Sequence, residues 1–382
     1  MHEFVHACAG AGKTESIIQR CKGDSLGSSR LAVTLTRTGQ RELEGRLARD
    51  CPPECRAQVL GWYGFLIHHC IRPYLPFCFQ GLRIGGFSFK GETKDAEEWR
   101  RKNLKFQKSG TRERYFDASN RIYRETIEEL ALLVMERSDG RVEKRLARIF
   151  DEVVFDEAQD ISRVGLDVIE RLVRQNDFSL YIVGDTRQSL LDSSLSSTRN
   201  KGADRLKLLK WYRKFEFEGL LEIKDLCETQ RFNQTIADFA DSIFGSEFEF
   251  AKTVSKFDLV SGHDGMFLVH GDDIDAYMKR YSPKLLRHSK SSAKHLSHLE
   301  FENFGEVKGQ TFDRVAIYAT GAMESFLSQG NYLEGKSACS FYVAVTRARH
   351  SVALLVKKPT KKMLANLPDQ IEVWQPNEVS LF

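Results

Sequence analysis

A short segment close to the N-terminus carries residue types that can bind phosphate. The run Ala7-Cys-Ala-Gly-Ala-Gly-Lys-Thr14 follows an expected strand and opens a segment with helical spacing. Glycines let backbone amides turn toward an anion, and the N-terminus of the following helix favours negative charge. The lysine can reach terminal phosphates, and the hydroxyl after it can hold Mg²⁺. We therefore predict a phosphate-binding loop formed by Ala9, Gly10, Ala11, Gly12, Lys13 and Thr14.

Two adjacent acids end a second expected strand, Glu152-Val-Val-Phe155. The carboxyl ends of strands in α/β sheets are where ligands bind. Asp156 can bind the Mg²⁺ of a nucleotide, and Glu157 can polarise a water for attack on the terminal phosphate. The alternative is that both acids only cap a helix, and the phosphate loop upstream favours the catalytic interpretation. Gln188, after the next expected strand, can sense the terminal phosphate.

Composition sets broad limits on the class of protein. The 382 residues suffice for two or three domains, and 41% hydrophobic with 29% charged residues exclude low-complexity chains. The formal net charge of +4 permits an anionic partner without requiring one. We expect a cytoplasmic protein with no membrane partner, because no signal segment precedes the loop and no apolar run reaches the length of a membrane span.

Soft metal-ligand types gather between residues 51 and 78. They lack the paired short spacings of a zinc site, so we favour reduced thiols over a metal. The residues concerned are Cys51, Cys55, His68, His69, Cys70 and Cys78.

The apolar pattern predicts the elements that must position these side chains. Short apolar runs alternate with helical patterns, which indicates parallel α/β architecture. A charge-dense stretch and an expected helix over 118–137 interrupt this order, and a basic, exposed connector is expected over 279–294. The expected strands are 4–7, 31–35, 58–63, 152–155, 180–183, 220–223, 266–269, 315–318 and 352–356, with a helix over 233–244.

The motifs and their order resemble those of the UvrD/Rep-type superfamily 1 helicases. In the first half the resemblance rests on the phosphate loop, Leu31-Ala-Val-Thr34-Leu-Thr36, Asp156-Glu-Ala-Gln-Asp160 and Val183-Gly-Asp-Thr-Arg-Gln188. In the second half it rests on Gln230-Arg-Phe232, Val307-Lys-Gly-Gln-Thr-Phe-Asp313 and Phe341-Tyr-Val-Ala-Val-Thr-Arg-Ala-Arg349. These motifs are spread over nearly the whole chain.

The resemblance implies an α/β protein with two RecA-like P-loop NTPase domains. We place them at residues 1–217 and 218–382, with a mostly helical insertion at about 72–148 in the first. It also implies an ATP-dependent single-stranded DNA translocase or helicase, 3′ to 5′ in direction, with ATP and Mg²⁺ as cofactors. Thr14 and Asp156 would hold the metal, and Arg231 and Arg347 would face the terminal phosphate.

Candidates for contact with the DNA strand come from the same resemblance. Thr34 and Thr36 match positions that touch the sugar-phosphate backbone, and Thr346 lies in the last motif. Trp62 is a candidate base-stacking platform, since stacking tolerates any sequence. The alternative is that Trp62 is an ordinary core aromatic.

Departures from the family pattern keep a second function open. An adenine-recognition motif is not seen upstream of the loop, and Gln230 replaces a stacking tyrosine, so we expect relaxed preference for ATP over GTP. Base-stacking aromatics after Gln188 are missing, Gly305 replaces a common histidine and Thr311 a common glutamate, and the large second-domain insertion is absent. The alternative is a nucleotide-dependent regulatory or assembly subunit of a nuclease, as in bacterial anti-phage (antiviral) defence. A small-molecule kinase would explain neither Arg347 nor the second α/β pattern.

Overall fold

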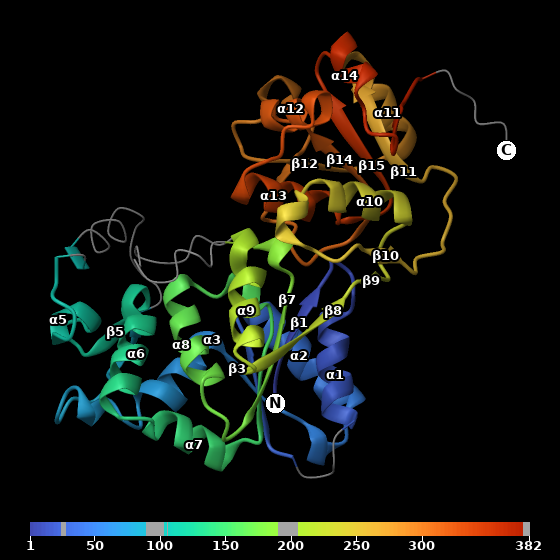
Figure 1. Ribbon diagram of the computed structural model, residues 1–382. Coiled ribbons are helices and arrows are strands. Elements are labelled where there is room, and N and C mark those ends of the chain that lie inside the picture. The colour runs from blue at the N-terminus through green and yellow to red at the C-terminus, as the bar shows by residue number, and fades with distance from the viewer. Residues whose placement is uncertain (24–27, 89–102, 105, 190–204, 377–382) are drawn as a thin grey trace. The chain divides into compact units, whose positions relative to one another are not determined.

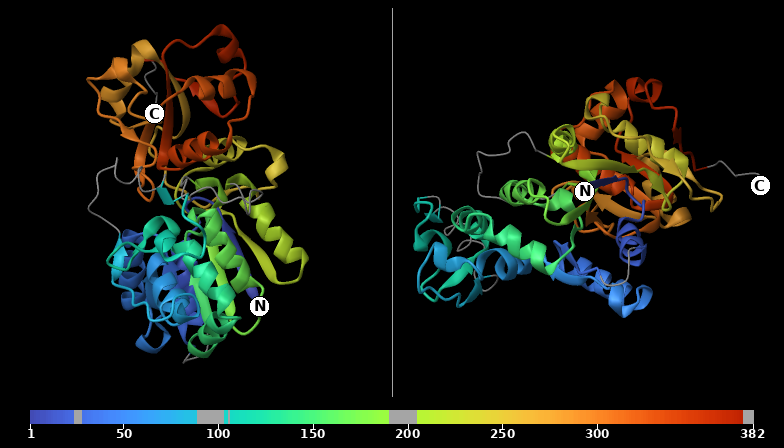
Figure 2. Two further views of the ribbon diagram at one scale, coloured as in Figure 1. Left: turned by 90° about the vertical axis from the view of Figure 1, so that its left-hand side faces the viewer. Right: turned by 60° about the horizontal axis from the view of Figure 1, so that its bottom comes forward.

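The computed structural model describes residues 1–23, 28–88, 103–104, 106–189 and 205–376, and it is built on two six-stranded sheets (Figure 1). Contacts group the chain into two compact units. The first holds Met1–Val5, Lys13–Gly184 and Leu191–Lys224, and the second holds His6–Gly12, Asp185–Leu190 and Asp225–Phe382. The second unit therefore includes the turns that follow two strands of the first sheet, and the chain can be followed through both units by its colour in Figure 2.

The first sheet has the strand order β3-β2-β6-β7-β1-β8. Its pairs β3–β2, β2–β6 and β6–β7 are parallel. Every residue of β2 and β6 is buried, which explains their continuous apolar runs. The strands are β1 (His2–Ala7), β2 (Arg30–Thr34), β3 (Gln58–Gly61), β6 (Glu152–Phe155), β7 (Ser179–Gly184) and β8 (Leu221–Leu226). The helices are α1 (Lys13–Gly23), α2 (Arg37–Asp50), α3 (Trp62–Phe65), α8 (Arg163–Val173) and α9 (Leu208–Phe217).

The second sheet has the order β13-β12-β14-β15-β11-β16, with all pairs parallel. Its strands are β11 (Gly265–His270), β12 (Lys284–Arg287), β13 (Glu302–Asn303), β14 (Phe312–Tyr318), β15 (Ala348–Val356) and β16 (Ile371–Val373). The helices are α10 (Gln234–Ser242), α11 (Ile274–Tyr281), α12 (Gly321–Gln329), α13 (Gly335–Val345) and α14 (Lys361–Ala365), and β9 (Glu228–Thr229) pairs with β10 (Val254–Ser255). This architecture confirms the α/β class with two RecA-like domains.

A π-helical turn, Leu66–Ile71, precedes the segment expected as an insertion, which contains both helices and a small sheet. Its elements are β4 (Gly86–Ser88), α5 (Arg112–Tyr115), β5 (Arg121–Tyr123), α6 (Ile127–Arg137) and α7 (Arg141–Ile149). Much of the charge-dense stretch lies outside the described residues. The boundaries at 72, 148 and 217 stay predictions.

Three predicted elements were wrong in part. The strand expected over 58–63 ends at Gly61, and Trp62 begins α3. The helix expected over 118–137 begins only at Ile127, because the Asp117 carboxylate accepts bonds from the amides of Ser119 and Arg121 and closes a turn instead. The connector expected over 279–294 contains β12, whose Leu285 and Leu286 are buried. Basic residues on both sides of this short apolar run hid the strand.

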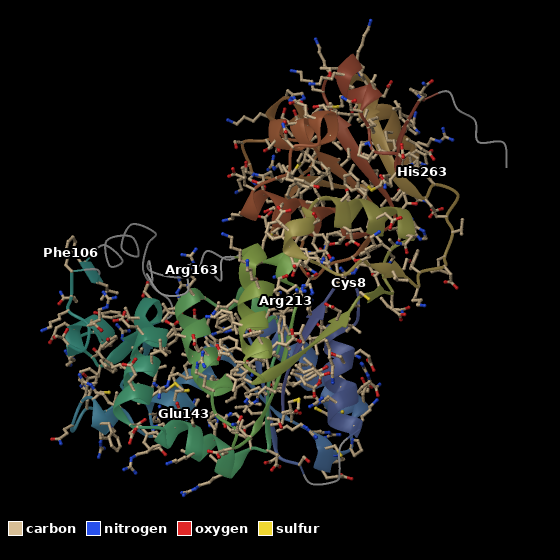
Figure 3. The ribbon with its side chains drawn as sticks, viewed as in Figure 1. Cys8, Phe106, Glu143, Arg163, Arg213 and His263 are labelled. Atoms are coloured by element: carbon tan, nitrogen blue, oxygen red, sulfur yellow. The ribbon has the colours of Figure 1, made fainter. Side chains whose placement is uncertain are left out.

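The core of the second unit includes an aromatic stack around His263. Figure 3 labels this histidine. The ring centroid of His263 lies 3.9 Å from that of Phe267 and 3.7 Å from that of Tyr281. Burial lowers the pKa of His263 to about 4, so this ring is neutral at physiological pH. Within the described residues, no helix is both long and apolar enough to cross a membrane.

Candidate active site

The phosphate loop depends on two glycines with left-handed backbone. Gly10 has φ +78° and Gly12 has φ +80°, conformations that L side chains rarely adopt. At Gly10 space is a second constraint, since a Cβ atom there would lie 2.5 Å from Thr229 Oγ1 and 2.6 Å from Arg231 Cβ. The loop ends where α1 begins at Lys13.

The first half of this loop is hydrogen-bonded within the second unit. The Cys8 amide donates to Leu226 O over 2.9 Å, and the Gln230 amide donates to Gly10 O over 3.1 Å. The Ala9 amide donates to the Tyr342 hydroxyl over 3.1 Å. The backbone amide of Ala11 donates to Cys8 O. The amides of Ala9 and Ala11, both predicted to bind phosphate, are therefore engaged in bonds within the protein.

In the first unit, the lysine and the two acids of the prediction lie together. Lys13 Nζ is 3.7 Å from Glu157 Oε1. Asp156 follows β6 and is 6% exposed, and its Oδ1 accepts the Glu157 amide over 2.9 Å. Glu157 has φ +54°, a conformation that is costly for a residue with a side chain and that is enriched at functional sites. The side-chain Nε2 of Gln159 donates to the Glu157 carboxylate.

Burial is the main cause of an unusual ionisation of Asp156. Together with the neighbouring Glu157 charge, burial raises the pKa of Asp156 to about 7, while Lys13 acts in the opposite direction. A buried carboxylate in this situation gains from a nearby cation. The Asp156 carboxylate and the Thr14 hydroxyl are hard oxygen donors of the kind that Mg²⁺ prefers, so these residues fit the ion.

The soft ligand types found in the sequence gain no support as a metal centre. Among the described residues, no group of three His, Cys, Asp or Glu side chains could hold a metal ion. Burial raises the pKa of Cys51, Cys70 and Cys78, which disfavours the thiolate form that metals need.

In the second unit, Gln188 and Arg347 belong to a buried polar network, and Arg231 lies at its partly exposed edge. Arg347 is 1% exposed and donates to Gln188 Oε1 over 3.2 Å, to Gln310 O over 3.2 Å and to Val343 O over 3.0 Å. Arg231 donates to Thr346 O over 3.1 Å. The structure therefore brings Gln188, Arg231 and Arg347 into one unit, although Gln188 is remote from the arginines in sequence.

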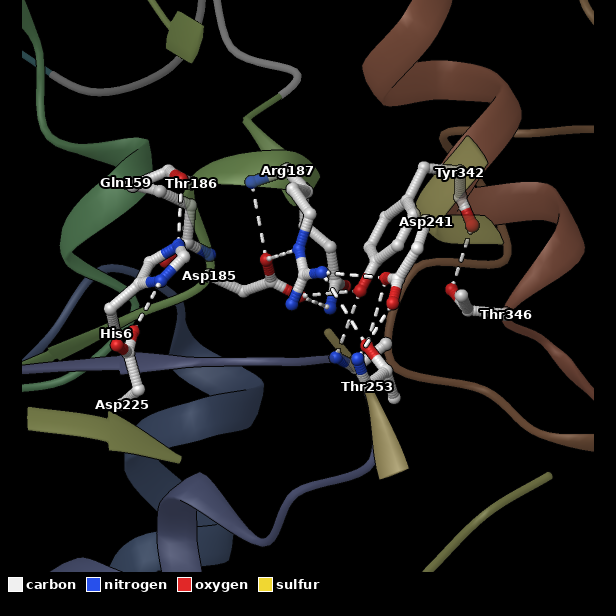
Figure 4. Close-up of polar contacts among 12 residues, drawn as sticks. His6, Gln159, Asp185, Thr186, Arg187, Asp225, Asp241, Thr253, Tyr342 and Thr346 are labelled. Atoms are coloured by element: carbon white, nitrogen blue, oxygen red, sulfur yellow. Dashed lines mark hydrogen bonds and ion pairs between the residues drawn. The ribbon is translucent and has the colours of Figure 1, made fainter. Parts of the chain in front are cut away.

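Sequence reasoning missed the centre of this network, Arg187 (Figure 4). It is 2% exposed and donates to Asp185 over 3.4 Å and to Asp241 over 2.9 Å. Its guanidinium also lies 5.1 Å from the Tyr342 ring centroid and 5.6 Å from that of Phe250. In the sequence Arg187 stands at an unspecified position of the Gly-Asp-x-x-Gln motif, which gave no signal of its burial.

Trp62 is in the core of the first unit. Its indole is 4% exposed, and Nε1 donates to Glu128 over 2.8 Å. The ring stacks on Phe65 and meets Phe155 edge-on. This position favours the core aromatic over the base-stacking platform.

The three threonines proposed to contact DNA have local roles in the structure. Thr36 caps α2 by accepting the Gly39 amide over 3.0 Å, and Thr34, which is 1% exposed, donates to Thr36 O over 3.2 Å. Thr346 is fully buried and donates to Tyr342 O over 2.8 Å. Their contacts with DNA stay predictions.

Residues 86–192 match the UvrD/REP helicase N-terminal domain. The match confirms the UvrD/Rep resemblance over this segment. This UvrD/REP segment holds Asp156, Glu157 and Gln188, whereas the phosphate loop and both arginines lie outside it.

Two solved structures are similar to the chain over most of its length. One is a crystal structure of Arterivirus nonstructural protein 10, a helicase, with 14% identity and a TM-score of 0.45 over 96% of this chain and 62% of that chain. The other is a complex of the same Arterivirus protein with DNA, with 14% identity and a TM-score of 0.44 over 96% of this chain and 63% of that chain. The chain thus spans less than two thirds of these solved chains. A comparison with curated proteins gave no match.

Proposed function

We propose that this protein is an ATP-hydrolysing DNA helicase that moves along single-stranded DNA. The observation that carries the proposal is the group in the first unit, where Lys13 Nζ is 3.7 Å from Glu157 next to the buried Asp156. A cation at a helix start beside two acids at a strand end suits phosphoryl transfer to water. The match of residues 86–192 to the UvrD/REP helicase N-terminal domain supports it.

In the first unit the acids have different tasks. Glu157 polarises the attacking water and takes its proton, and Lys13 offsets negative charge on the terminal phosphates. Asp156 and Thr14 would hold Mg²⁺, which neutralises charge on the phosphate oxygens when bound. Metal ligands must be deprotonated, so the raised pKa of Asp156 would make the affinity for Mg²⁺ depend on pH.

In the second unit the arginines stabilise the transferring phosphoryl group. Guanidinium groups match the charge that develops on its oxygens, so Arg231 and Arg347 are assigned this role. Gln188, bonded to Arg347, senses whether the terminal phosphate is present. A cycle of ATP binding and hydrolysis that uses these groups can drive movement along DNA in the 3′ to 5′ direction.

The test is the steady-state ATPase rate of the purified protein without nucleic acid, with single-stranded DNA and with single-stranded RNA. We expect DNA to raise the rate several-fold and RNA to raise it less. An ATPase rate that neither polymer changes would contradict a translocase. Equal rates with GTP and ATP would agree with the proposed relaxed base preference.

A nucleotide-dependent subunit of a nuclease, as in antiviral defence, is the second candidate. The observation that favours it is the buried Trp62, which leaves that position without the base-stacking role expected of it. Unwinding of a duplex with a 3′ single-stranded tail separates the two functions. Robust strand separation at low protein concentration and without a partner would exclude the subunit role as the main activity. A cytoplasmic location remains part of either proposal.

A further inference from the structure

The hydroxyl of Tyr342 joins two segments that the proposed ATPase uses. Tyr342 lies in α13 and is 1% exposed. Its hydroxyl oxygen accepts the Ala9 amide over 3.1 Å and lies 3.4 Å from Asp185 Oδ2. One atom therefore contacts both the phosphate loop and the turn that ends in Gln188. Figure 4 labels Tyr342 and Asp185.

The direction of these bonds follows from the chemistry of the groups. A phenol has a single proton, and an amide N–H can only donate. Because Ala9 supplies the proton in one bond, the proton of Tyr342 is directed to the Asp185 carboxylate. Burial raises the pKa of Tyr342 well above its ordinary value, so the hydroxyl keeps the proton that this bond requires.

Asp185 in turn fixes the orientation of the Gln188 side chain. Gln188 Nε2 donates to Asp185 Oδ2 over 2.6 Å, which turns the amide oxygen the other way. That oxygen accepts from Arg347 Nη2 over 3.2 Å. The two bonds agree on a single orientation of the amide, and the chain of bonds runs from Tyr342 through Asp185 and Gln188 to Arg347.

The other carboxylate oxygen of Asp185 is held separately. Asp185 Oδ1 accepts from the amide and the Nε of Arg187 over 3.1 and 3.4 Å. Arg187 is itself anchored by Asp241 and by the Tyr342 ring. The ring of Tyr342 thus has a packing role, while its hydroxyl has the separate role of orienting Asp185 Oδ2.

We propose that Tyr342 is a positioning residue of the ATPase, whose hydroxyl ties the phosphate loop to Asp185 and thereby orients Gln188 toward Arg347. This inference rests on the proposed function. If Tyr342 acted only through the packing of its ring, removal of the hydroxyl would leave ATP turnover unchanged.

Tyr342→Phe separates the two roles because it keeps the ring and removes only the hydroxyl. We expect kcat for ATP to fall about tenfold, the effect of one buried hydrogen bond, with KM for ATP within about twofold of wild type. The matched control is Tyr212→Phe. Tyr212 is fully buried, and its hydroxyl has no hydrogen-bond partner among the residues that the structure describes. We expect this variant to keep wild-type kcat.

The background Gln188→Ala tests the route of the effect. If Tyr342 acts through Gln188, then Gln188→Ala and Gln188→Ala/Tyr342→Phe have the same kcat. A Tyr342→Phe enzyme as fast as Tyr212→Phe, or a further tenfold loss in the Gln188→Ala background, would overturn the inference while wild-type hydrolysis upholds the proposed function. A wild-type protein that hydrolyses no ATP would instead overturn the proposed function itself.

Thermal unfolding of the same variants shows whether each is folded. If Tyr342→Phe does not fold, Tyr342→Met in the same assays takes its place. Methionine fills part of the ring's volume and has no hydroxyl. We expect Tyr342→Met to show the same loss of kcat, and no further loss in the Gln188→Ala background.

Discussion

The two groups of proposed catalytic residues differ in how the protein satisfies their charges. In the first unit, Lys13 and Glu157 form an ion pair over 3.7 Å, and burial raises the pKa of the neighbouring Asp156. In the second unit, Arg347 and Arg187 are buried and bonded to several oxygens each. The first group is therefore arranged to gain from a metal nucleotide, whereas the second is already organised by the protein.

This difference has a physical consequence for mutations. Burial of a charged carboxylate lowers the free energy of unfolding. A neutral residue in its place can therefore stabilise the protein while it impairs function. A buried arginine with a full set of partners cannot be removed in this way, since its partners would be left unpaired. The predictions below test this contrast, from the largest expected effect to the smallest.

Arg347→Lys tests whether the second group takes part in chemistry at all. We expect ATP turnover to fall by about 10³-fold, because an ammonium cannot reproduce the contacts of a guanidinium with the phosphoryl oxygens. The matched control is Arg349→Lys, two residues away, where the side chain is half exposed and pairs with Asp313 over 3.5 Å. Equal turnover of the two variants would contradict the assignment of Arg347.

Arg187→Met tests how strongly the network of the second unit holds its fold. We expect the free energy of unfolding to fall by about 3–5 kcal/mol, because Asp185 and Asp241 lose a buried partner. Urea denaturation followed by circular dichroism measures the change. Arg49→Met removes an exposed pair with Asp50 and should leave stability unchanged. A similar stability of both variants would show that the network contributes little.

Gly10→Ala tests the phosphate loop. A Cβ atom there would be 2.5 Å from Thr229 Oγ1 on a backbone with φ +78°. We expect a loss of about 1–3 kcal/mol of stability and weaker binding of a fluorescent ATP analogue. The matched control is Gly45→Ala in α2, where an added Cβ atom would have no atom of the described residues outside its own helix within 4 Å. We expect this variant to raise the free energy of unfolding by about 0.5–1 kcal/mol. Unchanged nucleotide affinity in Gly10→Ala would argue against this loop as the binding site.

Asp156→Asn tests the conflict between function and stability in the first group. The pKa of Asp156 is raised from 3.8 to about 7 by folding, so its contribution to stability is present at low pH and is lost as pH rises toward 7. Asparagine does not titrate. We therefore expect the difference in free energy of unfolding between variant and wild type to grow in favour of the variant from pH 4 to pH 8. The expected growth is at least about 1.4 kcal/mol, the free energy of one pKa unit. Denaturation in EDTA measures the difference, and an equal difference at both pH values would contradict the raised pKa.

The sequence was sufficient to predict most of the strands and the order of the motifs. Continuous apolar runs such as that of β6 identify buried parallel strands directly. The sequence was insufficient where hydrogen bonds from local polar side chains determined the backbone conformation. The turn at Asp117 interrupts a helical pattern, and β12 is a short buried run between basic residues.

The candidate site shows the same limit. Motifs identified Lys13, Glu157 and Arg347 by residue type, but motif order does not show which side chains bond to one another. The link between Tyr342 and Ala9 joins residues that are 333 positions apart. Trp62 shows the same limit, because an aromatic at a motif position gave no sign that its indole bonds to Glu128 in the core.

The central claim is that Glu157 activates the water that attacks ATP. The most direct measurement compares steady-state ATP hydrolysis by wild type and Glu157→Gln in the presence of single-stranded DNA, together with binding of a fluorescent ATP analogue. The account predicts that turnover falls at least about 100-fold, since a general base is lost, while nucleotide binding is retained. A Glu157→Gln enzyme that hydrolyses ATP at the wild-type rate would contradict it.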